Sequence, residues 1–111
     1  MDKKPIIPNK EKAHEIIVYM HATLHRYGIT PSNIAIFGSF MNGNNHAESD
    51  LDMIIISEKF EGRNQDQRIH MTREARLEVM KKYIVPMDIL LKTPKEYNNQ
   101  KLKMFDSKII I

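Results

Sequence analysis

Three short runs rich in isoleucine and leucine divide the chain, and longer segments with hydrophobic residues at every third or fourth position lie between them. The runs cover residues 34–37, 51–56 and a segment that opens at Pro86 and ends near Leu91. Short apolar runs bounded by turn residues are typical of largely buried strands. The spaced segments, residues 10–27 and 65–83, are typical of amphipathic helices.

The ends of the predicted helices carry recognisable signals. Asn9 and Gly28 suit the N-cap and C-cap of the helix over residues 10–27. Thr93 and Glu96 form a capping box at the start of a last helix over residues 94–105. We also expect a short helix over 39–42, a loop over 59–64, and a helix over 65–83 whose buried stripe consists of Ile69, Thr72, Ala75, Val79 and Tyr83.

The order of helices and strands predicts an α/β (α+β) fold, a small sheet flanked by helices. We expect residues 1–111 to form a single domain, because this length supplies one modest core. The pattern alone does not fix the directions of the strands.

The composition, with 41% hydrophobic and 28% charged residues, is typical of soluble globular proteins. The absence of cysteine excludes disulfides and thiolate metal sites. No signal-peptide pattern follows Met1 and no apolar run is long enough to cross a bilayer, so we expect a cytoplasmic protein without membrane contact. The net charge of +3 comes without a basic run interleaved with aromatic residues, so nucleic-acid binding is not expected.

Three aspartates stand at or near the starts of the second and third predicted strands. Asp50 and Asp52 flank Leu51, and Asp88 follows Pro86 by two residues. Because side chains alternate along a strand, Asp50 and Asp52 are expected on one face. Adjacent carboxylates on a core strand repel each other unless a cation or strong donors lie between them. The pattern therefore favours a site with oxygen ligands for Mg²⁺ or Mn²⁺.

Gly38 and Ser39 directly follow the first predicted strand. Glycine allows a tight turn and close backbone approach, and Ser39 suits the N-cap of a short helix. Free backbone N–H groups and a hydroxyl at such a turn can bind phosphate. A phosphate-binding turn and an aspartate cluster are the two parts needed for metal-assisted transfer of a phosphate-containing group.

The chain carries Phe-Gly-Ser at 37–39, Asp-Leu-Asp-Met at 50–53 and Met-Asp-Ile at 87–89. This combination resembles the signature of the nucleotidyltransferase superfamily that includes DNA polymerase beta. The resemblance runs over residues 34–97, and the small size of the chain is similar to that of minimal nucleotidyltransferase domains. Many of those domains are antitoxin partners of HEPN-domain toxins. The resemblance implies a mixed sheet with the three aspartates on adjacent strands.

The same resemblance implies a two-metal transfer reaction. Asp50 and Asp52 would hold two Mg²⁺ ions, while Asp88 would bind the ion nearer the acceptor and help to deprotonate its hydroxyl. Gly38 and Ser39 would bind the β- and γ-phosphates of ATP or another NTP. The resemblance also implies that AMP is transferred to a tyrosine of a HEPN toxin.

Two alternative functions remain open. Many minimal members carry a Gly-Ser-Arg-Ala-Arg-Gly stretch, and this chain has Phe40 and Asn42 at the two arginine positions. The first alternative is therefore a catalytically weak or inactive binding module that acts as an antitoxin by forming a complex. The second, transfer to a small molecule, would need a homo-oligomer, because the chain has no second domain to complete an acceptor pocket.

The remaining candidates are given structural interpretations. Arg63, Arg68 and Arg73 could supply positive charge to phosphates, but arginines on such a helix are expected to be solvated. The methionines are interpreted as adaptable core residues, among them Met41, Met53, Met71, Met80 and Met104.

Overall fold

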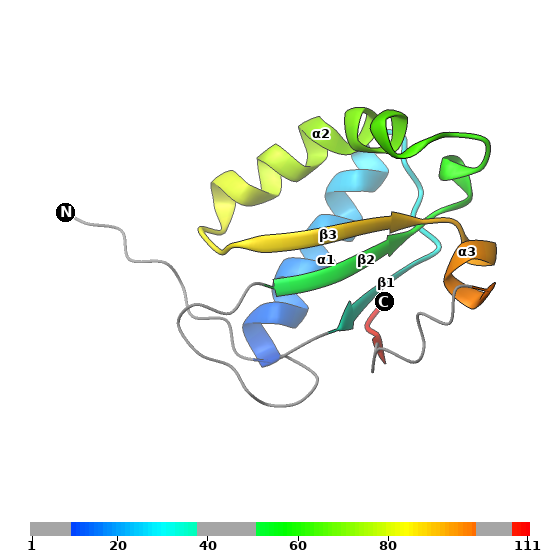
Figure 1. Ribbon diagram of the computed structural model, residues 1–111. Helices are drawn as coiled ribbons and strands as arrows, with labels where there is room; N and C mark the ends of the chain where they lie inside the picture. The colour runs from blue at the N-terminus through cyan, green and yellow to red at the C-terminus, as the bar shows by residue number, and fades with distance from the viewer. Residues whose placement is uncertain (1–9, 38–50, 100–107) are drawn as a thin grey trace.

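The computed structural model describes residues 10–37, 51–99 and 108–111, and the structural statements below concern these residues. In chain order they form helix α1 (Lys10–Arg26), strands β1 (Asn33–Phe37) and β2 (Leu51–Ile56), the 3₁₀ helix η2 (Glu58–Phe60), helix α2 (Gln65–Lys82), strand β3 (Met87–Lys92), helix α3 (Pro94–Asn99) and strand β4 (Lys108–Ile109) (Figure 1). None of the described helices is long and apolar enough to cross a membrane.

The four strands form one mixed sheet in the order β3-β2-β1-β4. Strand β1 runs antiparallel to both β2 and β4, whereas β2 and β3 are parallel. The α/β class and the mixed sheet predicted from the sequence are confirmed.

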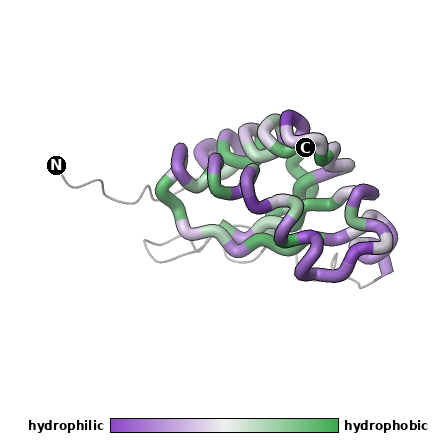
Figure 2. Tube along the Cα trace, turned by 90° about the horizontal axis from the view of Figure 1, so that it is seen from above, coloured by the Kyte–Doolittle hydropathy of each residue, from purple (hydrophilic) through white to green (hydrophobic). Residues whose placement is uncertain are grey.

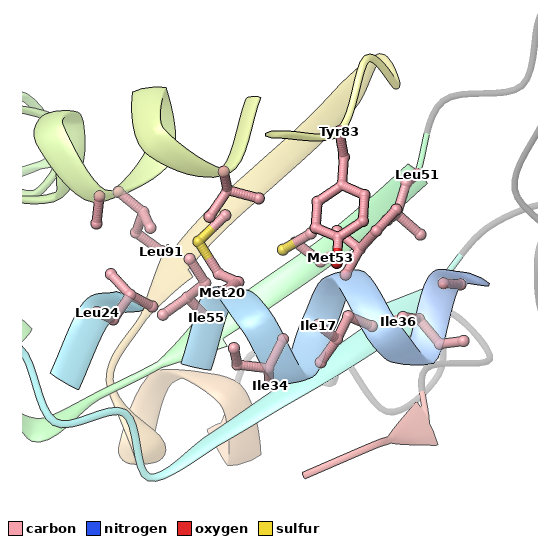
Figure 3. Packing of buried hydrophobic residues seen from close by; sticks show 14 of the residues in the cluster. Ile17, Met20, Leu24, Ile34, Ile36, Leu51, Met53, Ile55, Tyr83 and Leu91 are labelled. Carbon is pink, nitrogen blue, oxygen red and sulfur yellow. The ribbon is translucent and has the colours of Figure 1, made fainter. Parts of the chain in front are cut away.

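Helices α1 and α2 lie on one face of the sheet (Figure 1) and bury the main core against it. Alternate residues of β2 face this core, and each fully buried aliphatic side chain there stabilises the fold by about 1.5–3 kcal/mol. Seen from above the view of Figure 1, hydrophobic positions recur among hydrophilic ones along the helices (Figure 2). The close view of the core labels Ile17, Met20, Leu24, Ile34, Ile36, Leu51, Met53, Ile55, Tyr83 and Leu91 (Figure 3).

A smaller hydrophobic cluster occupies the opposite face of the sheet. It consists of the buried residues Ala35, Ile54, Ile56 and Tyr97, with Phe37 and Leu90 packed against them. Tyr97 belongs to α3, so this helix covers part of the face that α1 and α2 leave open.

Two of the helix ends predicted from the sequence, at Gly28 and at Thr93, are confirmed, whereas the predicted N-cap Asn9 lies outside the described residues. Gly28 has a φ of 81°, its N–H donates to the carbonyl of His25 at 3.0 Å, and the N–H of Ile29 donates to the carbonyl of Leu24 at 2.9 Å. These two bonds form a Schellman motif, which ends α1. At the start of α3 the backbone N–H of Thr93 donates to Glu96 Oε1 at 2.8 Å, and the N–H of Glu96 donates to Thr93 Oγ1 at 3.1 Å, as a capping box requires.

The predicted buried stripe of α2 is wrong at one position. Ile69 is 48% exposed, and Arg68 is buried in its place together with Thr72, Ala75 and Val79. Met80, interpreted as a core residue, is 43% exposed, whereas Met53 is fully buried. Helix α2 is therefore rotated so that one flank carries hydrophobic side chains outside the core.

Two further differences concern short elements. The predicted loop over 59–64 begins with the 3₁₀ helix η2, whose Phe60 is buried. Strand β4, near the end of the chain, was not predicted from the sequence. Two backbone bonds of 2.9 Å join the residues that follow it to β1: the N–H of Ile34 donates to the carbonyl of Ile111, and the N–H of Ile110 donates to the carbonyl of Ile34. The predicted helix over 39–42 and the end of the helix over 94–105 lie outside the described residues.

Candidate active site

Asp52 and Asp88 lie beside each other on neighbouring strands. Each is the second residue of its strand, and the parallel register of β2 and β3 makes them partners. Partnered residues point to the same face of a sheet, and adjacent strands are about 4.7–4.9 Å apart. Asp52 is half-buried and Asp88 is exposed, so the pair is accessible from solvent.

The two carboxylates occupy the sheet face opposite α1 and α2. Met53 and Ile55 pack in the main core, so the alternate residues Asp52 and Ile54 face the other way. On its second side Asp52 is partnered by Phe37, the last residue of β1. The site therefore lies where β1 ends and where β2 and β3 begin.

Hydrogen bonds at both ends of the β2–β3 ladder fix this arrangement. The N–H of Leu51 donates to the carbonyl of Pro86 at 2.8 Å, and the N–H of Ser57 donates to the carbonyl of Lys92 at 3.0 Å. Burial of Leu91 against the helices adds a side-chain anchor for β3. Backbone pairing and core packing together thus place Asp88 next to Asp52.

The other predicted site residues, Gly38, Ser39 and Asp50, lie outside the described residues. The described neighbours of that segment are Phe37, the last residue of β1, and Leu51, the first residue of β2, so both lie beside Asp52 at the same end of the two strands. The structure thus brings together Asp52 and Asp88 and leaves the placement of the other three as a prediction.

The chemistry of the pair suits a hard divalent cation. Carboxylate oxygens are the ligands that Mg²⁺ and Mn²⁺ prefer, and two of them on one face concentrate negative charge. Within residues 10–37, 51–99 and 108–111, no group of three or more potential metal ligands gathers. Asp52 and Asp88 fit a cation as two ligands of a larger set, and Asp50, two residues before Asp52, is our candidate for the next.

Arg68 is the charged residue that sequence interpretation misplaced. Its side chain is 6% exposed, and its Nη1 and Nη2 donate to Glu96 Oε1 and Oε2 at 2.6 and 3.3 Å. Nη1 also donates to the carbonyl of Leu91 at 3.1 Å, and Nε donates to the carbonyl of Arg63 at 2.9 Å. With its donors engaged at the far end of β3, Arg68 is not placed to supply charge to a phosphate at Asp52 and Asp88.

The Arg68–Glu96 pair also has an electrostatic signature. The hydrogen bonds from Arg68 and from the Thr93 backbone hold the pKa of Glu96 below its usual range, against an opposing effect of burial. A sequence signal for Arg68 existed, since it is spaced four, seven and eleven residues before Thr72, Ala75 and Val79.

Comparison with known proteins identifies both a family and two similar folds. Residues 21–111 match the model of a family described as the nucleotidyltransferase domain. None of the curated proteins compared with the chain matches it. A proposed nucleotidyltransferase from Sulfolobus solfataricus is similar in structure, with a TM-score of 0.59 and 16% identity over 89% of this chain and 82% of that one.

The second similar structure is BolA1 from Arabidopsis thaliana. Its TM-score is 0.52 and its identity 22%, over 73% of this chain and 94% of that one. At such identities both structures show the fold alone. The family match, and not the fold, therefore bears on activity.

Proposed function

This chain belongs to the nucleotidyltransferase domain family, and on that premise we propose that it is a magnesium-dependent enzyme that transfers AMP from ATP to a hydroxyl group of a partner protein. The observation that carries the proposal is the register of Asp52 and Asp88, which places two carboxylates side by side on an accessible face. The choice of ATP, and of a HEPN-domain toxin as the acceptor, rests on the resemblance to minimal nucleotidyltransferase domains.

In this proposal Asp52 and Asp88 would hold the divalent cations together with Asp50, and Gly38 and Ser39 would bind the β- and γ-phosphates. The bound cations would neutralise phosphate charge and favour loss of the acceptor proton. The acceptor oxygen forms a bond to the α-phosphorus while the bond to the bridging oxygen of the β-phosphate breaks. Pyrophosphate leaves, and Asp88 takes the proton from the acceptor hydroxyl.

Nucleotide binding tests the first part of this proposal. Isothermal titration with ATP and Mg²⁺ should show binding by the wild type and a loss of about tenfold or more in Asp88→Asn, because a ligand and a negative charge are removed together. Asp66→Asn, which changes an exposed aspartate on α2, is the matched control and should bind like the wild type. Equal ATP binding by Asp88→Asn and the wild type would contradict the site.

Transfer itself is tested with the purified acceptor. Incubation with ATP and Mg²⁺ should raise the intact mass of the acceptor by one or more AMP units, and pyrophosphate should appear in equal amount. Failure of the wild type to modify a protein that it binds tightly would contradict an enzymatic role.

A binding module is the second candidate function. Phe40 and Asn42 stand where many minimal members have arginines, which leaves fewer cations to neutralise phosphate. Under this reading the complex with the partner protein, and the neutralisation of its activity, would survive Asp52→Asn and Asp88→Asn. The mass of the partner would then stay unchanged.

A further inference from the structure

Helix α2 carries a row of exposed hydrophobic side chains that the core does not use. Ile69, Leu77 and Met80 are 48%, 39% and 43% exposed, and Ile84, in the turn after the helix, is 43% exposed. At 3.6 residues per turn, the first three lie within about 80° of one another around the helix. We call this side of the helix, with Ile69, Leu77 and Met80, the α2 flank.

The α2 flank faces away from α1. Thr72, Ala75 and Val79 point into the core, and Glu78 accepts hydrogen bonds from Tyr19 and Tyr27 of the α1 segment. The hydrophobic row lies on neither of these sides. Since β3 is the outermost strand of the sheet on the side of α2 (Figure 1), the flank is open to a partner.

Two arginines accompany the hydrophobic row. Arg73 is exposed and Arg76 is half-buried. Arg76 turns back onto its own helix, where Nε donates to Thr72 Oγ1 at 3.0 Å and Nη2 donates to the carbonyl of Ile69 at 2.8 Å. Burial first, and then the charge of Arg73, lower the pKa of Arg76.

Neither arginine has an acidic partner among residues 10–37, 51–99 and 108–111. Among the described residues the arginines that form ion pairs are Arg26, with Glu78, and Arg68, with Glu96. The α2 flank therefore combines exposed apolar surface with positive charge that the described part of the chain does not neutralise. Apolar surface of this kind beside polar residues commonly marks an interaction site.

We propose that the α2 flank is the docking site for an amphipathic helix of a partner protein whose apolar side is bordered by glutamate or aspartate. The row from Ile69 to Met80 is about 16 Å long at 1.5 Å per residue, and its helical spacing suits the ridges of another helix. Methionine and arginine are both enriched at protein interfaces. Acidic residues beside Arg73 and Arg76 would supply the missing countercharge.

A second copy of this chain fits the α2 flank less well. A two-fold contact places the same surface of both copies together. Arg73 and Arg76 lie near the middle of α2, so two antiparallel copies would bring four arginines close to one another. This repulsion favours an acidic partner over self-association.

Two peptides of about 18 residues, long enough to form a helix, test the proposal. Both carry the same leucine row, but one borders it with glutamate and the other with lysine. Fluorescence anisotropy with the full chain should show that the glutamate peptide binds about tenfold more tightly than the lysine peptide. Arg73→Glu combined with Arg76→Glu should reverse this preference, and Arg73→Glu alone should reduce it without disturbing the bonds of Arg76.

Leu77→Asp should weaken binding of the glutamate peptide about tenfold. Val18→Asp is the matched control, since Val18 on α1 and Leu77 are both 39% exposed, and it should bind like the wild type.

Equal affinity for the two peptides, or no binding at millimolar peptide, would overturn the proposal. A wild-type dimer in sedimentation equilibrium that Leu77→Asp dissociates would also overturn it, because the occupant would then be a second copy. The test is independent of ATP, so its failure leaves the nucleotidyltransferase proposal standing.

Discussion

Removal of the Glu96 carboxylate should destabilise the fold strongly, because it leaves Arg68 buried without its countercharge. Glu96→Ala deletes two charge-assisted bonds from Arg68 and the acceptor for the Thr93 N–H. Breaking a buried ion pair costs about 3–5 kcal/mol, and losing a helix cap costs about 1 kcal/mol. Glu96 is 31% exposed whereas Arg68 is 6% exposed, so solvent reduces the first figure. We expect a loss of about 3 kcal/mol in the free energy of unfolding.

Urea unfolding at pH 7, followed by far-UV circular dichroism, measures this loss. For a domain of this size it corresponds to a fall in the melting temperature on the order of 10 °C. Glu96→Gln keeps an acceptor for Thr93 and Arg68 and should lose less, while Glu61→Ala, at an exposed position, should change stability by less than about 0.5 kcal/mol.

A double-mutant cycle provides the refutation. Arg68→Met removes the buried charge, so Glu96→Ala should cost much less in that background than in the wild type. Equal costs in the two backgrounds would show that the pair does not couple, and the reasoning would fail.

The pH dependence of stability is a second test. Since the folded-state pKa of Glu96 is lowered, the stability that Glu96 contributes is present above its unfolded pKa of about 4.3 and is lost as the pH falls further. The difference between wild type and Glu96→Ala should therefore shrink below about pH 4.

Three further predictions follow from the described contacts. Without divalent cations, Asp88→Asn should raise the free energy of unfolding by about 0.5 kcal/mol in thermal melts, because it removes repulsion from Asp52, and added Mg²⁺ should stabilise the wild type but not the variant. Burial, and then the hydrogen bond to Glu15, raise the pKa of Tyr83 to about 12. The stability that this raised pKa provides is fully present below about pH 10 and is lost as the pH approaches 12. In an absorbance titration of the tyrosines, Tyr83→Phe should remove the step at the highest pH. Gly28→Ala should lower the free energy of unfolding by about 1 kcal/mol, because φ is 81° at this position. No described atom lies within 4 Å of the added Cβ, so a clash is not the cause. An unchanged midpoint in urea unfolding would contradict this explanation.

Features that depend on local chemistry could be predicted from the sequence. The capping box at Thr93 and Glu96 and the glycine cap at Gly28 involve residues close in sequence. The short apolar runs in the sequence predict β1, β2 and β3. The pairing of Asp52 with Asp88 was also expected, but through resemblance to a family, because pattern alone does not give strand direction.

Features that depend on distant partners could not be predicted. Helical spacing places Arg68 on the buried side of α2, but its partner Glu96 lies 28 residues away, and no periodicity indicates that pairing. The exposure of Ile69 and Met80 reflects how α2 is rotated on the sheet, which the core as a whole determines. Strand β4 has two residues and exists because β1 offers it an edge.

The parallel register of β2 and β3 makes the site sensitive to chain length in the turn at residues 84–86. Because side chains alternate along a strand, an insertion or deletion of one residue there that displaced β3 by one position would turn the Asp88 carboxylate from the open face toward α2. Natural or engineered variation in this turn should therefore occur in steps that preserve the parity of the strand. Loop exchange between relatives can keep the fold intact and still separate the two carboxylates.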